Sequence, residues 1–296
     1  MANFILSSCT IADMPVEFFH KNDIPYACLH FQLNGKDYLD DCGQSVSYKS
    51  LYEQIAAGAM PTTSQVNPGE FISLFEPYLQ QQKDILHLAF SSGLSGTYNS
   101  ACLARDELLE KYPDRNLLVV DTLGASAGVA MFIEMVAEMR DRGVSIQEAH
   151  QWAEDNKMKI QSWVVPADLN HLKRGGRLSA TSAFVGTKLN IFPIIEVNAE
   201  GKLIPRFKVR GRKQVLAELI KIMETNADQN KDYAGKCFLG HANCYDEAKA
   251  FAELIEANFP NLKKPVIITD IGAVIGSHVG PGTLCLFYFG KKRVDI

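Results

Sequence analysis

The sequence predicts an α/β protein of two domains, with a parallel sheet in the N-terminal domain and a mixed sheet in the C-terminal domain. In the first half, short continuous apolar runs alternate with helical patterns, which is typical of a parallel sheet covered on both faces. In the second half, a hairpin pattern stands among crossover helices, which indicates a mixed sheet. The 296 residues, 47% of them apolar, are enough for two moderate cores. We place the boundary near residue 160, giving domains 1–160 and 161–296.

The best-marked helix of the first half begins at Pro68, because Asn67 can cap it and Glu70 completes a capping box. Ser145 and Glu148 repeat this box before a later helix. The expected order is a strand at 3–8, helices at 50–58 and from 68, a strand at 84–90, a helix at 96–112, a strand at 116–121, and helices at 125–143 and from 145.

The second half is expected to begin with a strand at 163–166 and a short helix at 167–179 that ends in a basic, glycine-rich turn. A hairpin over 192–209 follows, with its loop at 199–202. The remaining elements are a helix from about 213, a strand at 236–242, a helix at 246–259 and strands at 265–270 and 283–290. The segment "GSHVGPGT" is expected to be a loop that carries His278.

Composition and missing motifs exclude several classes of function. A formal net charge of -4 argues against a protein that binds duplex nucleic acid. No apolar run reaches the ~18 residues of a membrane span, and Met1 to Thr10 lacks a basic leader. The seven cysteines are scattered without a CxxC pair, so we expect reduced thiols, a cytoplasmic location and no metal site. Without GxxxxGK[ST] or GxGxxG, neither ATP nor NAD is expected as a cofactor.

Two turns rich in hydroxyl groups stand at predicted strand ends, where ligands bind in α/β sheets. "TTSQ" (62–65) precedes one helix, and "SSGLSGT" (91–97) connects a strand to another. For either turn alone, helix capping is a sufficient explanation. Together they favour a binding site. A serine hydrolase remains an alternative, with His278 and an aspartate completing a triad. However, the segment around Ser95 is one residue short of the G-x-S-x-G elbow.

Two basic clusters lie in the second half of this acidic chain. The first is Lys173, Arg174 and Arg177, and the second runs from Arg206 to Lys213. On a regular strand, Arg206, Lys208 and Arg210 would share one face. Such clusters are either solvated charged faces or docking surfaces for a phosphate-bearing or acidic partner.

Six segments together resemble the DegV proteins, in particular the fatty-acid-binding FakB group. They are "TSQVNPGEF", "SSGLSGTYNSA", "VVDTLGASAG", "LKRGGRLS", "GHANCYDEA" and "SHVGPGT", in the order of that family and over nearly the whole chain. The resemblance implies that one long-chain fatty acid, such as palmitate or oleate, is enclosed between the domains. It implies further that the carboxylate is presented to a separate ATP-dependent fatty acid kinase, FakA, which forms an acyl phosphate.

The resemblance also implies roles for individual residues. Thr63 and Ser92, with Ser91 as a substitute, would hydrogen-bond the carboxylate. Arg177, Arg206 and His278 would serve kinase engagement or phosphoryl transfer. The chain would then be no enzyme by itself. A lipid carrier without a kinase partner and a sugar-binding protein remain alternatives. The chain departs from the family where Ser8 and Cys9 replace its acidic first-strand tip and Ile11 is additional.

Overall fold

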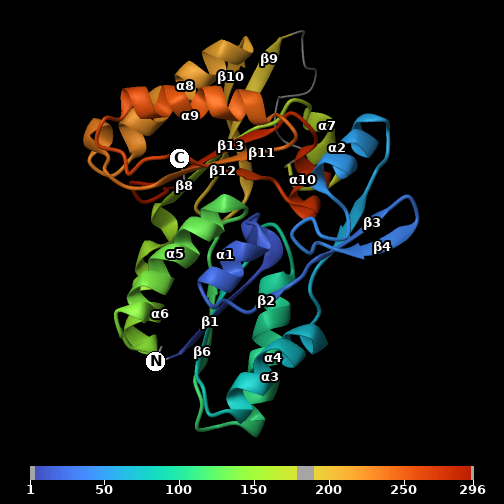
Figure 1. Cartoon of the computed structure of the whole chain (residues 1–296), viewed down its shortest axis with the longest axis vertical. Helices are drawn as coiled ribbons and strands as arrows, with labels where there is room; N and C mark the ends of the chain where they lie inside the picture. The colour runs from blue at the N-terminus through green and yellow to red at the C-terminus, as the bar shows by residue number, and fades with distance from the viewer. Residues whose placement is uncertain (1–3, 179–189, 295–296) are drawn as a thin grey trace.

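The computed structural model describes residues 4–178 and 190–294 (Figure 1). In its N-terminal half, four parallel strands form a sheet in the order β2-β1-β6-β7. These strands are β1 (Ile5–Cys9), β2 (Tyr26–Ala27), β6 (Ile85–Ala89) and β7 (Leu117–Asp121). The predicted parallel sheet is confirmed. Because its strands run in one direction, their carboxyl ends meet at a single edge, where the loops after β1, β6 and β7 lie.

Helices cover both faces of this sheet: α5 (Ala127–Asp141) and α6 (Ile146–Asn156) on one side, α3 (Pro68–Gln80) and α4 (Thr97–Lys111) on the other (Figure 1). Both predicted capping boxes are confirmed. The Asn67 side chain accepts from the Glu70 amide at 3.1 Å, and the Asn67 amide donates to the Glu70 carboxylate at 2.8 Å. Ser145 and Glu148 make the equivalent pair of bonds before α6. Two further helices, α1 (Val16–Lys21) and α2 (Tyr48–Ala56), lie in the first 60 residues.

The structure also contains a small antiparallel sheet, which the sequence analysis did not predict. Its strands lie in the order β4-β3-β5. Its strands are β3 (His30–Leu33), β4 (Lys36–Leu39) and β5 (Thr62–Ser64). Asn34 and Gly35 form the turn between β3 and β4 with φ of 52° and 78°. An Asn-Gly pair favours such a hairpin turn, so the sequence did contain the signal. In this sheet Thr63 pairs with Phe31 of the neighbouring strand.

The C-terminal sheet is mixed, as predicted, with six strands in the order β10-β9-β8-β13-β11-β12. Its strands are β8 (Ile160–Val165), β9 (Ile191–Val197), β10 (Leu203–Arg210), β11 (Cys237–His241), β12 (Ile267–Asp270) and β13 (Leu284–Phe289). Among the strands that the structure describes here, β11 and β12 pair in parallel and the other neighbouring strands pair antiparallel. Helices α8 (Arg212–Asn226) and α9 (Tyr245–Asn258) pack over one face through an apolar core of their own. The division into two domains near residue 160 stays a prediction.

Helix α10 (Ala273–Val279) corrects the prediction for the segment around His278. The residue lies in the last turn of this helix, and the loop begins only at Gly280. The buried Asp40 carboxylate accepts from the Val274 amide at 2.9 Å at the start of the helix. This distant partner explains why the glycine-rich segment forms a helix. The short helix α7 (Leu169–Arg174) precedes the basic turn, and the last residue of that motif, Ser179, lies outside the described residues. Within residues 4–178 and 190–294, no helix is long and apolar enough to cross a membrane.

Candidate functional site

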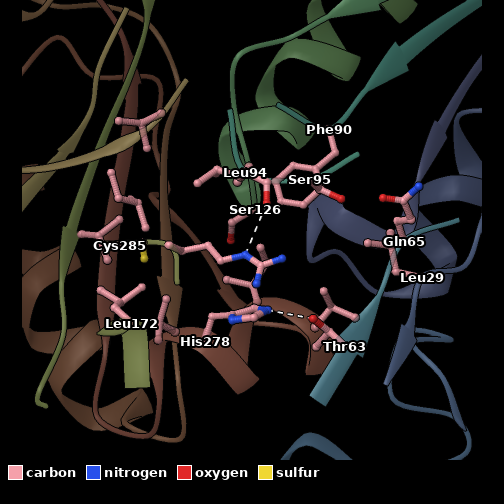
Figure 2. Close-up of a pocket in the computed structure, with 18 of the residues that line it drawn as sticks. Leu29, Thr63, Gln65, Phe90, Leu94, Ser95, Ser126, Leu172, His278 and Cys285 are labelled. Atoms are coloured by element: carbon pink, nitrogen blue, oxygen red, sulfur yellow. Dashed lines mark hydrogen bonds between the residues drawn. The ribbon is translucent and has the colours of Figure 1, made fainter. Parts of the chain in front are cut away.

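A cavity of about 300 Å³ lies between the parallel sheet and the mixed sheet (Figure 2). Its volume is at the lower end of the range for ligand pockets, ~300–1,000 Å³. Most of its lining is apolar and comes from every part of the fold: Leu29, Phe90, Leu94, Ala125, Val164, Leu172, Val197, Leu203, Val274, Ile275, Val279, Cys285 and Phe287. This surface suits a hydrocarbon better than a sugar, whose hydroxyls would lose their hydrogen bonds to water there.

Thr63 and His278 meet at a polar end of the cavity. The Thr63 hydroxyl and Nε2 of His278 are 2.8 Å apart, and both residues line the cavity (Figure 2). Thr63 comes from the small sheet and His278 from α10. Burial and the positive charge of Arg177 lower the pKa of His278 to about 4, so the imidazole is neutral at pH 7. A neutral imidazole can donate from Nε2 to the threonine oxygen, which leaves the hydroxyl hydrogen for a ligand.

Arg177 lines the same end of the cavity. Its guanidinium donates to the carbonyl oxygens of Leu94 and Gly175. Leu94 belongs to the turn after β6, so Arg177 connects this turn to the segment that follows α7. The structure therefore brings two of the predicted residues, Arg177 and His278, to the side of Thr63.

The serine turn places its three serines in different surroundings. Ser91 is buried and donates to the carbonyl oxygen of Gly201 at 2.8 Å. Ser92 is exposed, and its amide donates to Asp121 at 3.1 Å. Neither residue lines the cavity, whereas Ser95 does. The Ser95 hydroxyl lies 2.9 Å from that of Thr97 at the start of α4.

Gln65 was missed as a cavity residue, although "TTSQ" was singled out. Its side-chain amide donates to Ser100 at 2.9 Å, which joins the segment after β5 to α4. A Cβ at Gly96 would collide with the Gln65 amide, so the glycine permits this close contact. In Figure 2, Gln65 and Thr63 occupy one wall of the cavity, and Leu172 and Cys285 lie on the opposite side.

Ser126 was also missed. It lines the cavity with a backbone φ of 57°, and its hydroxyl donates to the buried carboxylate of Asp13. Burial raises the pKa of Asp13 well above its usual value. Asp13 follows β1, and its backbone oxygen accepts from the Thr269 hydroxyl near the end of β12. The segment after β1 thus supports the cavity wall indirectly, through Asp13. Neither Ser8 nor Cys9, the departures from the family pattern, lines the cavity.

A second pocket, of about 440 Å³, adjoins this polar end, and we call it the outer pocket. It shares Thr63, Arg177 and His278 with the cavity. The rest of its lining is Ala59, Met60, Pro61, Thr62, His171, Arg174, Gly175 and Ser277. The three shared residues therefore separate an apolar interior from a pocket with two arginines.

Arg206 lies apart from these three residues and lines neither the cavity nor the outer pocket. It forms an ion pair of 2.5 Å with Glu196 on the neighbouring strand β9. The pairing of β9 with β10 shifts by one residue between Pro205 and Phe207. The bulge at Arg206 interrupts the expected alternation that would place Arg206, Lys208 and Arg210 on one face.

The hydrogen bonds do not support a hydrolytic triad. Within the described part of the chain, Ser91, Ser92 and Ser95 form no hydrogen bond with a histidine, and His278 bonds to Thr63 instead. Among the same residues, no group of three or more His, Cys, Asp or Glu side chains could hold a metal ion.

Comparison with known proteins identifies relatives along the whole chain. The family described as "Uncharacterised protein, DegV family" matches residues 7–291. A DegV domain-containing protein of Clostridium perfringens is 40% identical over 293 residues, which is 99% of each chain. A DegV family protein from Thermus thermophilus, whose structure is described as binding fatty acid, is 27% identical with a TM-score of 0.87 over 98% of this chain and 100% of that one. DegV of Bacillus subtilis, described as a fatty acid binding protein, is 26% identical with a TM-score of 0.82. The match covers 98% of this chain and 100% of that one.

Proposed function

The chain belongs to the DegV family, and on that premise we propose that it binds one long-chain fatty acid in the cavity between its sheets. The ligand would be palmitate, oleate or a similar acid. The observation that carries the proposal is the cavity itself, which is apolar along most of its lining and polar where Thr63 meets His278. The structures described as fatty-acid-binding in Thermus thermophilus and Bacillus subtilis support it.

The hydrocarbon tail supplies most of the binding energy in this proposal. Burying a sixteen-carbon chain at about 0.8 kcal/mol per methylene offers roughly 12 kcal/mol as an upper bound. That amount retains the ligand without a salt bridge to its head group. The carboxylate can therefore be held by neutral hydroxyl groups, each contributing about 1.5–3 kcal/mol as a hydrogen bond to a charged group.

We assign the carboxylate to Thr63 and Ser95. The family resemblance implied Thr63 and Ser92, with Ser91 as a substitute, but Ser95 is the serine of that turn that lines the cavity. Two hydroxyl donors leave the carboxylate more electron-rich than an adjacent guanidinium would. This favours its attack on a phosphorus atom, and Arg177 at the same end would stabilise the charge that develops on the phosphoryl oxygens.

The finer proposal is that a separate ATP-dependent fatty acid kinase of the FakA type acts on the bound ligand, as in the FakB group. A carboxylate oxygen would attack the γ-phosphorus of ATP, forming a new P–O bond. The bond from that phosphorus to the β,γ-bridging oxygen would break, and ADP would leave with the electron pair. Arg206, outside both pockets, is proposed to engage the kinase. The chain alone would then carry no catalytic activity.

The test has two stages. Mass spectrometry of an organic extract of the purified protein is expected to yield one long-chain fatty acid per chain. An empty or polar extract that stays empty after incubation with palmitate would refute fatty acid binding. In the second stage, the loaded protein is mixed with the kinase and ATP, and acyl phosphate is trapped as the hydroxamate. A loaded protein that gives no hydroxamate would leave a lipid carrier without a kinase partner as the function.

A further inference from the structure

A further pocket, on the C-terminal sheet, has no part in the proposed function. Its volume is about 600 Å³, and its lining consists of His241, residues 243–247 and Asp270. We call it the strand-end pocket. None of these residues lines the cavity or the outer pocket. Most of them belong to the segment "GHANCYDEA", which fatty acid binding leaves unexplained.

The strand-end pocket lies where two parallel strands end. His241 is the last residue of β11, Asp270 is the last residue of β12, and the two residues are paired across the strands. The chain continues from β11 into α9 and from β12 into α10, and these helices pack on opposite faces of the sheet (Figure 1). Ligands of open α/β sheets bind at such points, because the diverging connections leave a crevice at the carboxyl ends of the strands.

His241 lines this pocket as a buried side chain without a hydrogen bond. Its side chain is 6% exposed, and within the described residues its Nδ1 has no partner. Its Nε2 lies 3.6 Å from Oδ1 of Asp270, which is too long for a hydrogen bond. Burial lowers the pKa of His241 despite the nearby carboxylate, which agrees with a neutral ring. Because buried polar groups are normally hydrogen-bonded, this ring indicates a partner from outside the chain.

The strand-end pocket also has a negative charge that its neighbours do not neutralise. Its lining contains three carboxylates and neither lysine nor arginine. Glu247 pairs with Arg212 at 2.6 Å. Within the described residues, Asp246 forms no ion pair, and Asp270 contacts only the neutral His241. The first turn of a helix favours acidic residues, which accounts for Asp246 and Glu247 in α9 but not for Asp270 at a strand end.

The remaining side chains suit a cation rather than an anion or a sugar. Tyr245 is 55% exposed, and its ring lies edge-on to that of His241 with centroids 5.6 Å apart. Cations bind favourably over the face of a tyrosine ring. An ammonium group has three donors, so one group can bond to both Nε2 of His241 and the carboxylate of Asp270. An anion would be repelled by the carboxylates, and a sugar would leave their charge uncompensated.

We propose that the strand-end pocket binds a small organic cation of the polyamine class. Asp270 and Asp246 are its carboxylate ligands, His241 is a neutral acceptor and Tyr245 is an aromatic wall. Two carboxylates without a cationic partner favour a ligand with more than one ammonium group. The site goes beyond the proposed function and does not depend on it, because it shares no residue with the cavity.

Spermidine is the probe, and its binding is followed by calorimetry and by NMR of the rings of His241 and Tyr245. We expect one spermidine per chain, with ring resonances that shift and saturate. Asp270→Asn and Asp246→Asn are each expected to weaken binding by about tenfold or more. Glu253→Gln is the matched control, because Glu253 is an exposed carboxylate on α9 outside the pocket. It should change the affinity less than about twofold. Palmitate binding by every variant checks the fold.

MgCl2 and 1,4-butanediol test whether the site selects an organic cation, and neither is expected to shift the two rings. The proposal is refuted if spermidine binding does not saturate, or if Glu253→Gln weakens it as much as Asp270→Asn does. It is also refuted if Mg²⁺ at equal concentration produces the same shifts, because charge screening would then explain them. If spermidine binds as expected but the parent does not bind palmitate, the proposed function fails and the cation site stands.

Discussion

The hydroxyl of Thr63 lies 2.8 Å from Nε2 of His278, although 215 residues separate them in the chain. One residue belongs to the small antiparallel sheet and the other to the last turn of α10. Their contact forms the boundary between the apolar cavity and the outer pocket. The predictions below follow from this boundary and from the residues that hold it together.

Thr63→Val and Ser95→Ala are expected to lower acyl-phosphate formation with a fatty acid kinase by about ten- to a hundredfold each, because each removes a hydrogen bond to a charged group. Palmitate retention should fall much less, since the tail supplies most of the binding energy. Ser92→Ala is the control, because Ser92 is exposed and outside the cavity. Rates are measured as trapped hydroxamate. If Ser92→Ala lowers acyl-phosphate formation and Ser95→Ala does not, then Ser92 rather than Ser95 binds the carboxylate.

His278 is expected to titrate near pH 4, because burial and Arg177 lower its pKa from 6.5 to about 4. The folded state then binds fewer protons than the unfolded state between these values. The contribution of the neutral ring to stability is therefore complete above pH 6.5 and is lost as the pH falls towards 4. The imidazole resonance, assigned by its absence in His278→Gln, measures the midpoint by NMR. A midpoint near 6.5 would contradict a buried ring beside Arg177.

Asp40 should have the opposite pH dependence. Burial raises its pKa from 3.8 to about 6, despite its hydrogen bonds from the backbone at the start of α10. The protonated carboxyl of Asp40 makes its full contribution to the free energy of unfolding below pH 3.8. This contribution is lost as the pH rises through about 6. The loss is of order 3 kcal/mol at most. Urea unfolding from pH 4 to 7 should show it in the parent relative to Asp40→Asn, which stays neutral. Parallel stability profiles for the two proteins would contradict the shift.

Gly175→Ala is expected to separate ligand binding from phosphoryl transfer. A Cβ at this position would overlap Nδ1 of His278 and push the ring away from Thr63. We expect retention of fatty acid with a fall in acyl-phosphate formation of about tenfold or more. Gly124→Ala is a suitable control, because its Cβ would find only ordinary contacts of 3.6 Å or more. Equal activity of the two variants would show that the Thr63–His278 contact is dispensable.

Local sequence was sufficient to predict most elements of the fold. Asn67 and Glu70 predicted the start of α3, because a capping box depends only on residues three positions apart. The continuous apolar runs at β6 and β7 predicted buried parallel strands, because both faces of these strands are covered. The hairpin of β3 and β4 was overlooked although Asn34 and Gly35 marked its turn.

The helix around His278 could not be predicted in the same way. Gly276 disfavours a helix locally because it lies in the interior, yet α10 forms around it. Asp40 supplies an acceptor for its first turn from 234 residues away. Tyr52 also lies against Gly276, where a side chain would not fit. Tertiary contacts thus overrode the local preference.

By itself, the sequence determined the α/β class, the parallel and mixed sheets and the family, because these depend on apolar periodicity, capping residues and motifs read along the chain. It also indicated that hydroxyl groups from two strand ends belong to one site. Only the tertiary structure decided which hydroxyls face the cavity. Ser91 turns away to Gly201, Ser92 points to solvent beside Asp121, and Ser95 lines the cavity. The physical reason is that side-chain direction within a tight turn depends on partners that are distant in sequence, and no local pattern records them.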